Sequence, residues 1–181
     1  AYTELAATAS DAVNALDELY GVQLFDLAAR TRPKAMYFSE IMSYIQLTGV
    51  IFPYISEPNI NVHQPAYGIP STMCHELSHI CGFMREDEAN FISYLACYHS
   101  GNIELQYSGA MMGLIHATNR LYRYDPNAWQ EICSLLPEGV LRDISANSRY
   151  WKKYETPVGE AADRWNDAYL KANAQTDGVQ S

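Results

Sequence analysis

Hydrophobic residues recur at helical spacing near the start of the chain. Five of them, three or four positions apart, precede Gly21: Leu5, Ala9, Val13, Leu16 and Tyr20. Residues with this spacing share one face of an α-helix, and glycine commonly ends a helix. The pattern therefore predicts one amphipathic helix, followed by a shorter helical or loop segment that ends at Arg32.

After Pro33 the pattern changes to short segments rich in aromatic and β-branched residues. Ala35–Phe38 and Gly49–Ile55 are separated by turn-like polar residues, which is typical of short strands. Pro53 lacks the N–H that a central strand donates, so we expect the second strand at a sheet edge. The stretch Ser56–Pro70, rich in Pro, Asn and Gly, is predicted to be a loop.

From Ser71 onward the sequence is predicted to be almost wholly helical. The expected segments are bounded by glycine or proline and comprise Ser71–Cys81, Glu86–His99, Leu105–Tyr122, Asn127–Leu136 and Gly159–Ala174. Helices that follow a small N-terminal sheet are typical of an α+β domain, with the chemistry near the junction. We expect one mostly helical domain over residues 1–181.

Composition and charge make several classes of function unfavourable for this chain. The chain has 181 residues, 48% of them hydrophobic and 18% charged, as in a folded globular domain. Its net charge of −9 disfavours nucleic acid and anionic lipid head groups as partners. No apolar stretch approaches the roughly 20 residues that span a bilayer, and the first residues do not resemble a signal peptide.

The segment His75-Glu76-Leu77-Ser78-His79 has the pattern H-E-x-x-H. On a helix, His75 and His79 lie one turn apart on the same face, so both imidazoles can bind one Zn²⁺ while Glu76 points at the water on the metal. Catalytic zinc usually has three protein ligands and keeps its fourth position for water. A third ligand is therefore required.

An acidic cluster after Gly82 supplies the candidates for that ligand: Glu86, Asp87 and Glu88. Glu86 shares its helix face with small or polar residues, which lets this helix approach the motif helix closely. Glu88 shares its face with apolar residues that are expected to enter the core. We therefore favour Glu86, with Glu88 as the first alternative and Asp87 as a weaker one. Asn90, one turn after Glu86, is expected to orient a ligating histidine.

Four cysteines lack the CxxC spacing of many zinc and redox sites: Cys74, Cys81, Cys97 and Cys133. Free cysteine is among the most frequently buried residue types, so we favour buried thiols and keep one disulfide bridge as the alternative. Cys74, next to His75, is either a switch ligand or a packing residue.

The pattern His75-Glu76-x-x-His79 followed by Glu86-x-x-Ala89-Asn90 resembles the gluzincin branch of the zincin metallopeptidases. In that branch a later helix carries a glutamate ligand and, four residues on, an Asp or Asn that supports a histidine. The segment HELSHICGFMREDEANFISYLAC is closer still to a bacterial family of membrane-anchored, zincin-like domains of unknown function. Weaker similarity to that family extends to Gly49–Pro53 and Tyr169–Asn173.

The resemblance implies a zincin-like domain in the cell envelope, on the extracytoplasmic side of a bacterial membrane. Anchoring helices would precede Ala1, so membrane contact is expected only through that segment. The chain departs from the family pattern in the short spacer between His79 and Glu86, which is similar to that of metzincins. Arg85 stands where metzincins carry their third histidine, and a guanidinium cannot bind zinc.

The predicted activity is hydrolysis of peptide bonds. Zinc would lower the pKa of its bound water, and Glu76 would take the proton and pass it to the leaving amine. The edge strand Gly49–Ile55 is expected to align an extended substrate. Four residues are candidates for stabilising the oxyanion, and their spacing does not choose among them: Tyr107, His116, Arg149 and Tyr150.

Two other readings of the motif stay open. The first is a zincin-like sensor or interaction domain without turnover, because fold and ligands do not guarantee activity. Glu76 weighs against it, since a structural zinc site has no need of a general base. The second is a plain helical domain in which the motif occurs by chance.

Overall fold

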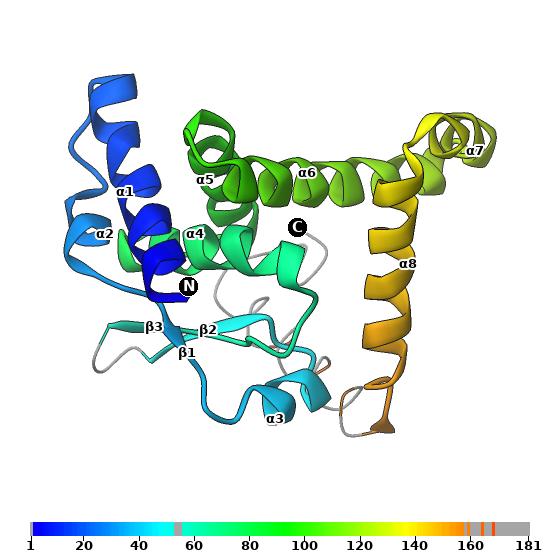
Figure 1. Ribbon diagram of the computed structural model, residues 1–181, viewed down its shortest axis with the longest axis horizontal. Helices are drawn as coiled ribbons and strands as arrows, with labels where there is room; N and C mark the ends of the chain where they lie inside the picture. Colours follow the sequence, from blue (N-terminus) through cyan, green and yellow to red (C-terminus); the bar gives the residue numbers. More distant parts are fainter. Residues whose placement is uncertain (1, 53–55, 158, 160–163, 165–167, 169–181) are drawn as a thin grey trace.

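Helices dominate the architecture, with a small sheet against one side of them (Figure 1). A computed structural model of the chain describes residues 2–52, 56–157, 159, 164 and 168. Its helices are α1 (Tyr2–Tyr20), α2 (Asp26–Arg30), α3 (Ser39–Tyr44), α4 (Ile69–Ile80), α5 (Glu86–His99), α6 (Ile103–Tyr124), α7 (Pro126–Leu135) and α8 (Glu138–Lys152). The strands are β1 (Lys34–Ala35), β2 (Gly49–Phe52) and β3 (Glu57–Ile60), and a 3₁₀ turn, η1 (Ala66–Gly68), precedes α4. The predicted α+β class is confirmed.

The sheet has the strand order β1-β3-β2, with β1 parallel and β2 antiparallel to β3. As predicted, β2 lies at an edge; Pro53 itself falls outside the described residues. The prediction of a loop over Ser56–Pro70 was wrong, because β3 lies within it at the centre of the sheet. Tertiary pairing overrides the weak strand propensity of this segment. Pro58 is tolerated because β1 pairs only with Asn59 and Ile60, which leaves Pro58 a strand neighbour on one side only.

The first predicted strand is shorter than expected. Only Lys34–Ala35 pairs with β3, and the chain then turns into α3, which the pattern did not predict. Tyr37 is 90% exposed, so its aromatic character does not reflect a buried strand.

The hydrophobic core lies where α1, α4, α5 and β3 meet, with α4 at its centre (Figure 1). The predicted α1 face is largely confirmed, since Ala9, Val13 and Leu16 are buried, whereas Tyr20 is half exposed. Other fully buried side chains come from the strands and later helices: Ile60, Met73, Leu77 and Leu105. Cys74 and Cys97 are buried free thiols, as favoured, and Cys81 and Cys133 are partly buried free thiols.

Three buried serines join the helices around the motif. The Ser93 hydroxyl donates to the carbonyl of Ser71 at 2.7 Å, and the Ser71 backbone N–H donates to the Ser108 hydroxyl at 2.9 Å. These bonds connect α4 with α5 and with α6. Small side chains allow the three helices to approach closely, and the hydrogen bonds satisfy the polar groups that are buried there.

Helix α8 lies on the side of the molecule opposite α1 and runs from the end of the α6–α7 arm toward α3 (Figure 1). Tyr107 donates a hydrogen bond to Asp143 at 2.6 Å, and the Tyr150 hydroxyl lies 2.5 Å from that of Ser43. The sequence prediction missed α8, in which polar residues outnumber the apolar ones that recur at helical spacing. The predicted helix Gly159–Ala174 lies mostly outside the described residues. Within the described part of the chain, every helix is too short or too polar to span a membrane.

Candidate metal centre

Helix α4 carries the H-E-x-x-H motif, as predicted. Pro70 lies in its first turn, where the missing N–H costs no helical hydrogen bond. Just after the helix, Gly82 has a φ of +97°, a left-handed conformation that glycine adopts without strain. The chain then reverses, and α5 begins at Glu86. The reversal places the first turn of α5 beside the motif.

The donor atoms of His75, His79 and Glu86 converge. The two Nε2 atoms are 3.0 Å apart, the Nε2 of His75 is 3.2 Å from Glu86 Oε2, and the Nε2 of His79 is 3.7 Å from Glu86 Oε1. Ligands at about 2.1 Å around a tetrahedral zinc ion are about 3.4 Å from one another. In the described part of the chain, this is the one group of three His, Cys, Asp or Glu residues whose donor atoms lie within 4.8 Å of one another.

The two alternative ligands point elsewhere. The Asp87 carboxylate accepts hydrogen bonds from the Arg85 guanidinium at 2.8 and 3.0 Å, and Glu88 lies 3.8 Å from the same guanidinium. Both carboxylates are about half exposed. The geometry thus brings Glu86 to the histidines and leaves Asp87 and Glu88 on the surface.

Glu86→Ala is expected to weaken zinc binding on the order of a hundredfold, because it removes one of three protein ligands. Glu88→Ala is the matched control and should leave the affinity unchanged. Competition with a chelating dye measures both. An equal loss of zinc affinity in the two variants, or a loss only in Glu88→Ala, would contradict Glu86 as a zinc ligand.

Hydrogen bonds behind the ligands hold the imidazoles in place. The Nδ1 of His79 lies 2.6 Å from the carbonyl oxygen of Phe83. A carbonyl can only accept, so Nδ1 carries the proton and the neutral ring presents the Nε2 lone pair to the centre of the group. Asn90 lies in the second turn of α5, and its side chain acts to raise the pKa of His75.

Asn90→Ala is expected to weaken zinc binding about 10- to 100-fold while leaving the stoichiometry unchanged, because a bond that orients a ligand is lost rather than a ligand. Chelator competition measures the change. Asn119→Ala, at an exposed position of α6, is the matched control. An affinity equal to that of the wild type would show that His75 needs no such support.

The charged groups of this cluster shift one another's pKa values. Burial acts to lower the pKa of His75, but the hydrogen bond to Glu86 and the two nearby carboxylates raise it overall. For Glu86, burial acts to raise the pKa, and the bond and positive charge of His75 lower it overall. Burial, then the charge of His75, lowers the pKa of His79. Zinc binds neutral imidazole and ionised carboxylate, so zinc affinity is expected to fall at acidic pH.

Glu76 lies beside this group and is buried. Its side chain is 5% exposed and contacts Gly49 of β2. No hydrogen bond to its carboxyl group is present among the described residues. Burial raises its pKa to about 7; the charge of His75 opposes the shift and that of Glu86 adds to it. A carboxyl group with a pKa near neutrality can both accept and return a proton.

The four candidates for oxyanion stabilisation are spread over α6 and α8. The hydroxyls of Tyr107 and Tyr150 are engaged with Asp143 and Ser43. Arg149 lies in the last turn of α8 and is exposed. The pKa of His116 is lowered by partial burial of its ring and by the charge of His75, so its ring lies within the electrostatic reach of the motif. Among the described residues, no hydrogen bond or ion pair joins any of the four to Glu76.

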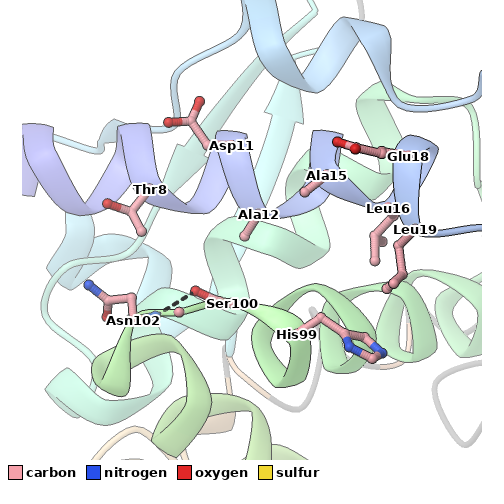
Figure 2. A pocket seen from close by; sticks show the side chains of 11 residues that line it. Thr8, Asp11, Ala12, Ala15, Leu16, Glu18, Leu19, His99, Ser100 and Asn102 are labelled. Atoms are coloured by element: carbon pink, nitrogen blue, oxygen red, sulfur yellow. Dashed lines mark hydrogen bonds between the residues drawn. The ribbon is translucent and has the colours of Figure 1, made fainter.

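A depression of about 780 Å³ lies elsewhere, between α1 and the α5–α6 connection (Figure 2). Its floor includes Ala12, Ala15 and Leu16, and His99 and Ser100 face them. None of the metal-binding candidates lines it. The chemistry on α4 is therefore separate from this hollow.

Sequence reasoning missed two contributors to the site. The Phe83 carbonyl leaves no trace in the sequence, because every residue has one. Gly49 does leave a signal, since glycine within a strand often marks close approach of another group.

Comparison with known proteins identifies one family. A family model described as a protein of unknown function (DUF3810) matches residues 3–181. Searches of curated proteins and of solved structures found no match.

Proposed function

We propose that this chain, which belongs to the DUF3810 family by a match over residues 3–181, is a zinc-dependent peptidase. His75, His79 and Glu86 are the proposed zinc ligands, and Glu76 is the proposed general base. The observation that carries the proposal is the convergence of three donor atoms next to a buried carboxyl group with a raised pKa. The resemblance to gluzincins supports the same roles.

Zinc is the metal that this donor set favours. Two imidazoles and one carboxylate match the ligands of catalytic zinc sites, whereas Mg²⁺ and Ca²⁺ prefer oxygen ligands throughout. Three protein ligands leave one position for water or substrate. A purely structural zinc site is usually closed by four protein ligands, so an open site favours catalysis.

His75, His79 and Glu86 would hold the zinc ion, which when bound would supply Lewis-acid chemistry to the scissile carbonyl and to the attacking water. Glu76 accepts the proton of the attacking water on its carboxylate and returns it to the leaving amine nitrogen, so it ends the cycle as it began. The low polarity around Glu76 raises its pKa to about 7 and so matches this task.

The position of β2 supports a peptide as the substrate class. This strand pairs with β3 along one side and forms an edge of the sheet, and Gly49 brings it against Glu76. A free strand edge presents backbone donors and acceptors to an extended peptide, which would add as a further strand. The proposed substrate is therefore a peptide or an extended protein segment. Because the chain resembles a bacterial family of membrane-anchored, zincin-like domains, we propose that the activity lies on the extracytoplasmic side of a bacterial membrane.

A non-catalytic sensor or interaction domain is the alternative. Burying a carboxyl group costs stability, and a domain that only binds a partner or a metal gains nothing from the burial of Glu76. The environment of Glu76 therefore favours catalysis.

Two measurements test the proposal. Protein purified without chelator should contain about one zinc ion per chain by mass spectrometry of the metal, as expected for a single site. A peptide library should be cleaved by the zinc-loaded protein, left intact after chelation, and cleaved again after zinc is restored. Stoichiometric zinc without cleavage would favour the non-catalytic alternative, and protein that cannot be loaded with zinc would contradict the site.

A further inference from the structure

We propose that Gly49 is a positioning residue, whose missing side chain creates the space in which β2 holds the Glu76 carboxyl group. The catalytic meaning of this inference rests on the proposed function. The steric relation between the two residues does not depend on it.

The contact between the two residues is too close for any side chain at position 49. A Cβ built on Gly49 would lie 2.4 Å from Glu76 Oε1 and 2.7 Å from both Cδ and Cγ, whereas real Cβ atoms essentially never approach closer than 3.0 Å. The clash involves three successive atoms of Glu76, so rotation of the carboxyl tip alone cannot relieve it.

Glu76 has little room to move away. Its side chain is 5% exposed, and its neighbours on α4, Cys74 and Leu77, are fully buried in the core. Interiors are close-packed, so an added methyl group displaces its neighbours. An alanine at position 49 must push Glu76 away from the strand or push β2 away from α4.

Backbone conformation does not explain the glycine. Gly21 and Gly82 are the glycines with positive φ in the described part of the chain, and Gly49 is in extended backbone paired with Ile60. Any residue can adopt this conformation, and glycine weakens a strand relative to residues with side chains. Space for Glu76 is the remaining physical role of Gly49.

For catalysis, this contact would fix the distance between the substrate backbone on β2 and the general base Glu76. The same short strand would bind the substrate backbone along its free edge and touch the general base with Gly49. Gly49→Ala should therefore lower kcat for peptide cleavage, because proton transfer needs the carboxylate within hydrogen-bond reach of the attacking water. The metal ligands are untouched, so zinc affinity should stay within about threefold of the wild type.

A double-mutant cycle tests the steric relation without any substrate. In the metal-free protein, Gly49→Ala should lower Tm by about 3–10 °C, as expected for overpacking in a chain of this size. In the Glu76→Ala background the same substitution should have no effect or raise Tm, because the methyl group enters the vacated space. In the Glu76→Gln background, Gly49→Ala should still lower Tm, since glutamine has the shape of glutamate.

Gly101→Ala is the matched control, because nothing lies within 4 Å of a Cβ built there. Equal Tm changes for Gly49→Ala with and without the Glu76 side chain, or no change in either case, would overturn the inference. If Gly49→Ala fails to fold, folding of the Gly49→Ala/Glu76→Ala double variant supports the inference and failure of both overturns it. Absence of hydrolysis in the wild type would refute the peptidase proposal and leave the cycle unaffected.

Discussion

His75→Ala and His79→Ala are each expected to lower zinc affinity by at least about a thousandfold, to a level at which purified protein contains no stoichiometric zinc. Each substitution leaves one imidazole and one carboxylate, and two ligands do not hold zinc against solvent. The remaining imidazole also loses a neighbour at 3.0 Å. Metal content after purification and competition with a chelating dye measure the loss.

Thermal unfolding gives an independent readout of the same loss. A ligand present at about a thousand times its Kd stabilises the folded state by about 4 kcal/mol, which raises Tm by roughly 10 °C in a chain of this size. Zinc should raise the Tm of the wild type by this amount and leave the Tm of both histidine variants unchanged. His99→Ala, at the exposed end of α5, is the control and should respond as the wild type does. Zinc retained by the His75→Ala/His79→Ala double variant would contradict the metal centre.

Glu76→Gln is expected to retain zinc and to lower kcat/KM for peptide cleavage on the order of 10²- to 10⁴-fold. Glutamine fills the space beside Gly49 and leaves the ligands in place, but its amide cannot accept a proton. The assay uses a peptide that the wild type cleaves, with zinc content measured on the same samples. Undiminished cleavage by Glu76→Gln would exclude Glu76 as the general base, and loss of zinc would assign it a role in metal binding.

Glu76→Gln also tests the burial of Glu76 independently of catalysis, through the pH dependence of the free energy of unfolding. The folded pKa of about 7 lies above the ordinary value of 4.5, so the metal-free folded state binds this proton more tightly than the unfolded state does. The contribution to stability is therefore fully present below about pH 4.5 and is lost as the pH rises through 7. A pKa raised from 4.5 to about 7 corresponds to a loss of about 3 kcal/mol. At pH 8 metal-free Glu76→Gln should exceed the wild type in unfolding free energy by about this amount, and at pH 4 the two should be similar.

Denaturant titrations across this pH range measure the difference. Glu88→Gln, at an exposed position of the neighbouring helix, should follow the wild-type pH dependence. Parallel curves for wild type and Glu76→Gln would mean that Glu76 is solvated in the folded protein.

Local pattern was sufficient to predict the two helices that carry the candidate site, α4 and α5. The spacing of the two histidines required a helix, and α4 and α5 were predicted to within about two residues because periodicity, Gly82 and the acidic start of α5 are short-range signals. The preference for Glu86 over Glu88 also came from helical geometry, since residues two positions apart face different directions. The structure agrees with that preference in placing Glu86 beside both histidines.

Other elements depended on contacts between distant residues. The strand β3 has a loop-like sequence, and it becomes the centre of the sheet because β1 and β2 pair with it on both sides. Helix α8 has no fully buried residue. It is attached to the rest of the fold by hydrogen bonds between Asp143 and Tyr107, more than thirty positions apart, and between Tyr150 and Ser43, more than a hundred positions apart. The sequence of β3 has no strand pattern, whereas the apolar residues of α8 do recur at helical spacing but are outnumbered by polar ones.

The chain by itself therefore determined the donor set, the helix that presents the histidines and the acidic helix that follows. All three depend on interactions within a few residues of one another. The folded structure alone decided that Glu76 loses its solvent, that β2 lies against it through Gly49, and that the Phe83 carbonyl sets the proton on His79. Desolvation, close packing and hydrogen-bond partners are properties of neighbours in space, and the order of residues along the chain does not specify them locally.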